Sequence, residues 1–169
     1  MRSRCVFLAL SFIISAGCLC PSLAASKRKC PVTKPSDHPF VPPPPYKSDV
    51  GRDEFLYGTP ALWTLIYPRW RLRSGAHGQK LPYFRQGYDW MKEPAPLLTV
   101  VARRLDSNAP LVWNGGYANN AIIEGEGEAG MFMVTGVDIP SSGCLEIAAH
   151  YLGGPDGIRT LTYTVWVAP

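Results

Sequence analysis

Three kinds of residue could carry chemistry in this 169-residue chain: three histidines, five cysteines and a group of closely spaced glutamates. Histidine is the side chain whose ordinary pKa suits acid–base catalysis near neutral pH. His38, His77 and His150 are far apart in the sequence, and none lies in a catalytic or zinc-binding motif. We therefore expect a protein that is not an enzyme, with an enzyme whose site is dispersed along the chain as an alternative.

Glu124, Glu126 and Glu128 lie in a segment whose glycines match the G-x-G-x-x-G spacing of dinucleotide-binding loops. Such a loop must open a helix whose N-terminus receives the phosphates, whereas Met131 to Ile139 is typical of a strand. The three carboxylates would also repel phosphate. Their oxygens make them a candidate calcium site, but their mutual repulsion favours a solvated acidic loop, so we expect no cofactor and no metal.

The N-terminus has the pattern of a secretory signal peptide. Arg2 and Arg4 precede an uncharged run from Val6 to Ile14, and small residues surround a cleavage position after Ala24. Residues 1–24 are thus predicted to be removed on export to the periplasm or the extracellular space. A permanent membrane-spanning anchor is disfavoured, because the uncharged segment also contains Ser, Gly and Pro.

A second processing route is open at Cys18. The segment Ser15-Ala16-Gly17-Cys18 resembles a bacterial lipobox, in which cleavage before the cysteine accompanies acylation of its thiol, although Ser15 replaces the usual Leu. A lipid at Cys18 would anchor the protein to the membrane, with about 0.8 kcal/mol of affinity per buried methylene. Any membrane contact is expected only through this N-terminal lipid.

The number of cysteines left after processing differs between the two routes. Cleavage after Ala24 leaves Cys30 and Cys144, whereas cleavage before Cys18 leaves Cys20, Cys30 and Cys144 beside the lipidated residue. Exported thiols tend to pair, so the even count favours the soluble form and a Cys30–Cys144 disulfide. Its loop of more than 100 residues would stabilise the fold by about 4 to 5 kcal/mol. Two unpaired thiols are the alternative.

Length and charge set the class of protein. Removing 24 of 169 residues leaves 145, which suits one hydrophobic core. Removal of Arg2 and Arg4 leaves 15 of the 17 basic residues and 13 acidic ones. The resulting net charge of +2 does not indicate nucleic-acid binding. We expect a single domain with an unknown protein or glycan of the cell envelope as its partner, and an unknown oligomeric state.

Residues 25–53 are predicted to form a disordered, proline-rich arm. Seven prolines lie between Ser26 and Arg52, and few residues there could make a periodic apolar face. Pro42 to Pro45 indicate extended polyproline II. A ligand for a proline-recognising domain is one interpretation, and a stiff spacer is the one we favour.

From residue 54 to residue 169 the pattern predicts an antiparallel β-sandwich of immunoglobulin-like character. Short apolar runs are separated by Gly, Pro, Asn and Asp, and no long amphipathic helix is indicated. Strict alternation from Leu161 to Val167 predicts a strand with one buried face. The expected strands are Ala61–Tyr67, Trp70–Arg73, Tyr88–Lys92, Leu97–Leu105, Pro110–Trp113, Met131–Ile139, Cys144–Tyr151 and Arg159–Ala168.

Five short motifs are spread over most of the mature chain: Cys30-Pro31-Val32-Thr33, Tyr57-Gly58, Leu62-Trp63-Thr64, Arg103-Arg104-Leu105-Asp106 and Gly143-Cys144-Leu145-Glu146-Ile147. In these motifs the chain resembles a family of uncharacterised bacterial exported proteins. The resemblance implies a small exported β domain with no known activity, and it places both cysteines inside family motifs. The family commonly has Trp where this chain has Leu145. This difference bears on side-chain packing and not on membership of the family.

Aromatic residues are densest between Tyr67 and Trp90, a stretch that also contains Phe84 and several basic residues. Exposed aromatics on a sandwich can stack on sugars or anchor a protein partner. The candidate binding residues are Tyr67, Trp70, Tyr83, Tyr88 and Trp90. We expect most of them to be core, so the favoured function is a non-catalytic envelope or extracellular binding or structural module, with a carbohydrate-binding module as the first alternative.

Overall fold

The computed structural model describes residues 30–37, 39–48, 50–51, 53–67, 70–71, 79–107, 112–113, 118–124, 127–137, 139, 141–153 and 157–168. The predicted signal peptide and Cys18 lie outside the described residues, as do His38, His77 and Glu126. Among the described residues, no helix has the length and apolarity needed to cross a bilayer.

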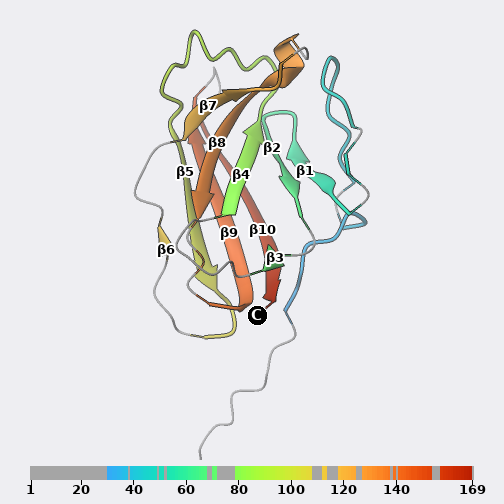
Figure 1. The fold of residues 1–169 in the computed structure, drawn as a ribbon, viewed down its shortest axis with the longest axis vertical. Helices are drawn as coiled ribbons and strands as arrows, with labels where there is room; N and C mark the ends of the chain where they lie inside the picture. Colours follow the sequence, from blue (N-terminus) through green and yellow to red (C-terminus); the bar gives the residue numbers. More distant parts are fainter. Residues whose placement is uncertain are drawn as a thin grey trace, which may run out of the picture.

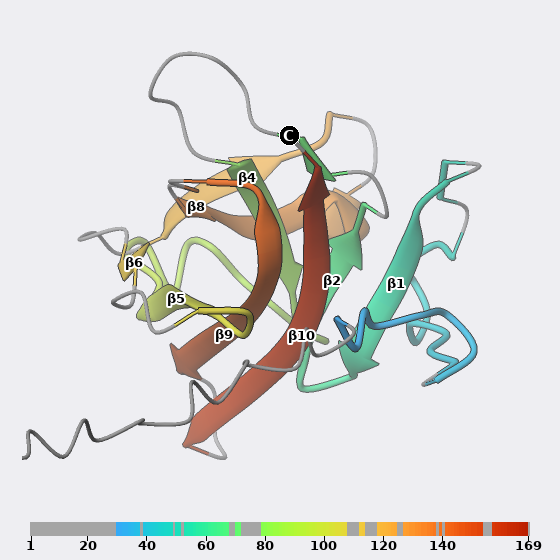
Figure 2. The same ribbon diagram turned by 90° about the horizontal axis from the view of Figure 1, so that it is seen from below.

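The strands form two sheets that face each other (Figures 1 and 2). The first sheet has the order β1 (Phe55–Thr59), β2 (Leu62–Ile66), β4 (Gln79–Phe84), β8 (Met131–Val137) and β7 (Asn119–Ile122). The second has three long strands, β10 (Ile158–Ala168), β9 (Gly143–Leu152) and β5 (Leu98–Arg104), flanked by the two-residue strands β3 (Trp70–Arg71) and β6 (Val112–Trp113). All pairings are antiparallel except that of β3 with β10. The predicted all-β class is confirmed.

The core lies between the two sheets and is built from alternate residues of each long strand. In β10, Leu161, Tyr163, Val165 and Val167 are buried, whereas Trp166 is exposed, as the alternation predicted. Strand β9 contributes Leu145, Ile147, Ala149 and Tyr151 in the same way. Side chains of successive residues point to opposite faces, so these strands bury one face in the core. On the other face, Thr164 and Cys144 are buried as well, where the arm bonds to β10 and β9.

Several strand predictions are corrected by the structure. Residues 88–92 form turns instead of a strand, because the Asp89 carboxylate accepts the Met91 N–H and the Lys92 N–H bonds to the Asp89 carbonyl. Strands β1, β4 and β7 were not predicted. Strand β4 contains Pro82, which normally argues against a central strand. Here the Thr64 hydroxyl donates to the Pro82 carbonyl at 2.6 Å, beside a β2–β4 pairing of only two residue pairs.

The prediction of a disordered arm is wrong for its described residues. The Thr33 N–H donates to the Thr164 carbonyl of β10 at 2.9 Å, and the Thr33 hydroxyl accepts the Thr164 N–H. Pro42 is buried, and the Tyr46 N–H donates to the Pro43 carbonyl, so the proline run ends in a turn with a cis Pro44–Pro45 bond. The arm folds back because the Cys30–Cys144 disulfide bonds its start to β9, and because its aromatic side chains pack on Trp63 of β2.

Candidate functional site

The disulfide between Cys30 and Cys144 joins the arm to the second sheet. The S–S bond is 2.04 Å long and the two Cα atoms are 5.5 Å apart, so the predicted pairing is confirmed. Cys144 lies near the start of β9, opposite Trp166 of β10. The bond therefore fixes the arm at one end of the sandwich.

Asp106 organises the backbone beside this disulfide. Its carboxylate accepts the Cys144 N–H at 3.0 Å and the Arg104 Nε–H at 2.8 Å. Hydrogen bonding to Arg104, followed by that to the Cys144 N–H, lowers the pKa of Asp106. Arg103 forms an ion pair with Glu146 at 2.6 Å on the same strand pair. The Arg103–Asp106 motif and the Gly143–Ile147 motif thus meet at this point, which we call the disulfide junction.

Gly143 leaves the space that the junction needs. Its φ angle is +138°, a conformation that favours glycine, and a Cβ atom there would overlap the Arg104 guanidinium and the Asp106 carboxylate. Arg104 also contacts the Ser141 hydroxyl on the chain entering β9. The glycine therefore leaves room for the Arg104 and Asp106 side chains to pack against the start of β9.

A row of aromatic rings crosses the outer face of the first sheet, the face turned away from the core. Trp63 stacks on Phe84 with centroids 5.9 Å apart, and Phe84 stacks on Phe132 at 5.3 Å. The arm covers one end of this row, because Phe40 and Tyr46 pack on Trp63 at 5.6 and 4.9 Å. Trp63 is only 1% exposed as a result. The arm and the aromatic row together line a pocket.

The pocket lies between the arm and the outer face of the first sheet and has a volume of about 300 Å³. Tyr46, Lys47 and Val50 of the arm form one wall, and Leu65 and Phe84 belong to the sheet side. Pockets of this size take small apolar groups, with polar residues at the rim for orientation. This arm-walled pocket is the candidate ligand site.

The other lining residues complete the chemistry of the pocket. Leu56 of β1 and Ile123, just after β7, add apolar surface, and Glu54 adds a carboxylate. The Gly51 N–H donates to Glu54 at 3.3 Å, which fixes the carboxylate beside the arm. Lys47 and Glu54 thus bring opposite charges to a lining that is otherwise mostly apolar.

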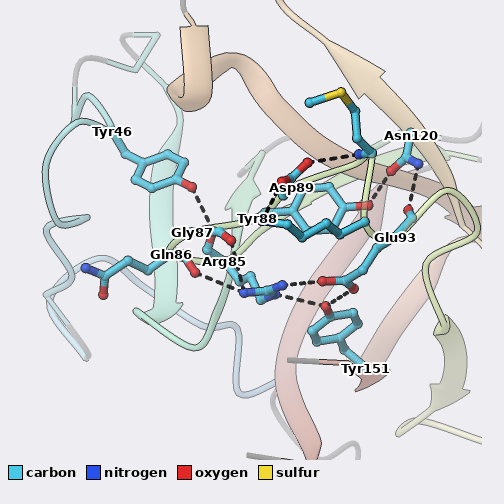
Figure 3. Close-up of polar contacts among 11 residues, drawn as sticks. Tyr46, Arg85, Gln86, Gly87, Tyr88, Asp89, Glu93, Asn120 and Tyr151 are labelled. Carbon is cyan, nitrogen blue, oxygen red and sulfur yellow. Dashed lines mark hydrogen bonds and ion pairs between the residues drawn. The ribbon is translucent and has the colours of Figure 1, made fainter. Parts of the chain in front are cut away.

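A second polar cluster links the start of the loop that follows β4 to a later part of the same loop, as Figure 3 shows. Arg85 forms an ion pair with Glu93, and its Nε–H donates to the Tyr151 hydroxyl at 2.9 Å. The Tyr151 hydroxyl in turn donates to Glu93. The side chains of Arg85 and Glu93 are only 15% and 21% exposed. We call this group, with Tyr88 and Asn120, the polar clamp.

Tyr88 and Asn120 extend the clamp to the first sheet. The Tyr88 hydroxyl donates to the Asn120 side-chain oxygen, and the Asn120 amide donates to the carbonyls of Glu93 and Pro94 at 2.9 and 3.1 Å. Burial raises the pKa of Tyr88, and burial followed by the bond to Glu93 raises that of Tyr151 to about 12. These tyrosines are therefore neutral donors at pH 7. Each of the five side chains is bonded within the loop or to a clamp neighbour, so the cluster positions the loop.

The candidate binding aromatics do not form an exposed platform. Trp70, Tyr83 and Tyr88 are at most 2% exposed, Tyr67 is half-buried, and only Trp90 is exposed, at 42%. Their apolar surface is part of the core, so three of the five cannot stack on a sugar. Trp63 lines the pocket but was not predicted as a binding residue, and the dense aromatic stretch around Phe84 was the only sequence signal for this face.

The remaining sequence candidates are dispersed. His150 is exposed on β9 and shares a hydrogen bond of 3.2 Å with the Thr160 hydroxyl. Glu124 is exposed, whereas Glu126 and the side chain of Glu128 lie outside the description. Residues 127–130 form a short 3₁₀ helix. Within the described ranges, no group of three or more His, Cys, Asp or Glu residues is placed to hold a metal ion.

The fold and these sites define a small two-sheet β domain with a disulfide-anchored arm and a pocket under that arm. Comparisons of the chain with protein-family models, with curated proteins and with solved structures found no match.

Proposed function

We propose that this chain is an exported, non-catalytic binding module of the cell envelope or extracellular space, and that the arm-walled pocket is its ligand site. One observation carries the proposal. The arm is fixed by the Cys30–Cys144 bond, packs Tyr46 on Trp63 and supplies one wall of a cavity of about 300 Å³. A spacer without a binding role would not need to build such a wall.

The lining favours a ligand with an apolar group about the size of one or two rings. Leu56, Leu65 and Phe84 offer apolar contact, and burying such a group contributes about 25 cal/mol per Å². Lys47 and Glu54 would orient a polar substituent at the rim. The ligand is then an apolar moiety carried by a small molecule, a lipid or a partner's side chain.

Export is supported by the disulfide, because such bonds persist in oxidising compartments. The pattern of residues 1–24 would act as the export signal, either with cleavage after Ala24 or with lipidation at Cys18. Membership of the family of exported proteins belongs to the same proposal. It is supported by the meeting of the Arg103–Asp106 and Gly143–Ile147 motifs at the disulfide junction.

An immunoglobulin-like class is the finer form of the fold proposal. Two mainly antiparallel sheets packed face to face support it. The disulfide of this chain has a different place from that of antibody domains, since it links the arm to β9 instead of joining the two sheets through the core. We therefore base the class on the layer architecture alone.

A titration with N-phenyl-1-naphthylamine, an uncharged apolar dye, tests the proposed site. We expect saturable binding with one dye per chain. Leu65→Trp should fill the pocket while keeping an apolar side chain, and should weaken binding about tenfold or more. Val41→Trp adds the same ring at a position that is 76% exposed on the arm and outside the pocket lining, so it should bind normally. Equal binding by both variants, or no saturable binding, would overturn the proposal.

A further inference from the structure

Exposed large apolar side chains gather at the end of the sandwich opposite the disulfide junction. Nine such side chains are exposed among the described residues, and six of them lie in the loop after β4, at the ends of β7 and β9 and near the starts of β5 and β10, which meet at the top of Figure 1. These six form what we call the apolar end surface: Trp90, Met91, Leu97, Ile122, Leu152 and Ile158.

Hydrogen bonds connect the segments of this surface. The Leu152 N–H donates to the Leu97 carbonyl at 2.9 Å, and Leu152 is paired with Ile158 across β9 and β10. These three residues therefore form a row at the end of the second sheet. On the other side, the Asn120 amide ties β7, which ends with Ile122, to the carbonyls of Glu93 and Pro94 in the loop.

The polar clamp holds the loop that carries Trp90 and Met91. Arg85 and Glu93 pair at the two sides of this loop, and Tyr151 of β9 bonds to both. The exposed apolar side chains are thus presented by a fixed scaffold. A preorganised surface loses less conformational freedom when it binds a partner.

The area of the surface suits a protein interface. The six residues are 42% to 69% exposed. Large apolar side chains present on the order of 150 to 200 Å² each when free, so together they expose roughly 500 to 650 Å². That is near the upper range for the largest patch on a monomer, and two such patches would bury the roughly 1,000 Å² that a specific interface needs.

Charge on the described residues around the surface is balanced, which favours a second copy of the chain. Arg85 pairs with Glu93 and Lys92 with Asp89, and the neighbouring described segments add Glu124 and Arg159. On these described residues the three positive and three negative charges balance, so they do not attract an anionic lipid surface, and they allow two copies to face each other across a two-fold axis.

We propose that the apolar end surface is a homodimer interface, at which two copies meet end to end. The position of the arm fits this arrangement. Cys144 lies near the start of β9 and Leu152 at its end, so the arm of each copy is attached about 26 Å from the interface along the strand, at 3.3 Å per residue. An anchored arm and a free interface then lie at opposite ends.

Sedimentation equilibrium of the mature, disulfide-bonded chain between about 5 and 500 µM tests the interface. We expect a monomer–dimer equilibrium within this range, and a maximum dimension in small-angle scattering near twice that of the monomer. The double change Leu152→Glu and Ile158→Glu places like charges in the contact and should raise the dissociation constant at least about tenfold. Both residues are half or more exposed, so the fold should persist, which circular dichroism checks.

Val41→Glu is the matched control, because Val41 is exposed on the arm, outside the apolar end surface. It should leave the equilibrium unchanged. A wild-type chain that stays monomeric at 500 µM would overturn the proposal, and so would a compact side-by-side dimer or a dimer that the double variant leaves intact. A chain that stays monomeric but binds a different protein through this end would also overturn the proposal of a homodimer.

Discussion

The carboxylate of Asp106 accepts the backbone N–H of Cys144 at 3.0 Å, so a residue just beyond β5 holds the strand start that carries the disulfide. The Leu105 N–H also donates to the Cys144 carbonyl at 2.9 Å. Both polar groups of the Cys144 backbone are thereby bonded to the end of β5. The junction thus joins three parts of the chain: the arm, β5 and β9.

Replacing Asp106 with Ala should destabilise the fold by about 1 kcal/mol. The Cys144 N–H loses its acceptor and Arg104 loses its ion partner, and hydrogen bonds near the surface contribute about this amount. Urea unfolding measures the change. Asp37→Ala is the control, because Asp37 accepts the Lys34 N–H within one exposed turn. A loss as large in the control would contradict a special role for Asp106.

Gly143→Ala should cost more than Gly87→Ala, although both glycines have positive φ angles. At Gly87 an added Cβ meets nothing within 4 Å, so only the backbone conformation is penalised, by about 1 to 2 kcal/mol. At Gly143 the Cβ would also overlap the Arg104 side chain, which must then leave Asp106. Thermal unfolding of the two variants compares the costs, and equal values would contradict the steric argument.

The all-β class could be predicted because it depends on the local alternation of apolar and polar residues along single strands. Alternation from Leu161 to Val167 is enough to predict β10, since every second residue must enter the core. The disulfide could be predicted because the expected cleavage after Ala24 would leave only two cysteines, Cys30 and Cys144. Strand β7 could not, because Asn119 and Asn120 favour turns. Asn120 is held in the strand by its bonds to the loop, a tertiary contact that local propensity does not contain.

The pocket could not be predicted for a similar reason. Trp63 and Phe84 become neighbours only when β2 pairs with β4, and Pro82 hides β4 from a sequence-based assignment. The arm's prolines indicated a spacer, whereas its packing depends on Phe40 and Tyr46 finding Trp63 on the outer face of the sheet. Residues that are distant in the sequence therefore build the site together.

Glu93→Ala should destabilise the protein by about 2 to 4 kcal/mol. Arg85 would be left largely buried without its ion partner, and the Tyr151 hydroxyl would lose its acceptor. Glu93→Gln keeps an acceptor oxygen and should cost less. Asp89→Ala removes the partner of the exposed Lys92 and the acceptor of the Met91 N–H, both at the surface, so it should destabilise the protein clearly less than Glu93→Ala in urea unfolding. Similar losses at positions 89 and 93 would contradict the structural role of the clamp.

Removing the disulfide with Cys30→Ala and Cys144→Ala should lower the free energy of unfolding by about 4 to 5 kcal/mol, because the bond closes a loop with a sequence separation of 114 residues. Either single change breaks the same bond, so each should cost nearly as much as the double change. Trypsin should also cut faster after Lys47, which is exposed on the arm and followed by Ser48, once the arm is released. Unchanged cleavage would mean that packing on Trp63 alone holds the arm.

Alkaline titration should reveal the buried tyrosines. Burial is the first cause of raised pKa values at Tyr57, Tyr67, Tyr83, Tyr88 and Tyr163, and also at Tyr151, whose pKa reaches about 12. The unfolded chain ionises near pH 10 and the folded one later, so stability is complete below pH 10 and falls as the pH rises from 10 towards 12 and beyond. Absorbance at about 295 nm should show late ionisation that coincides with loss of circular dichroism. Ionisation of all eight tyrosines near pH 10 in the folded protein would contradict this burial, whereas the same result in 6 M guanidinium is the expected control.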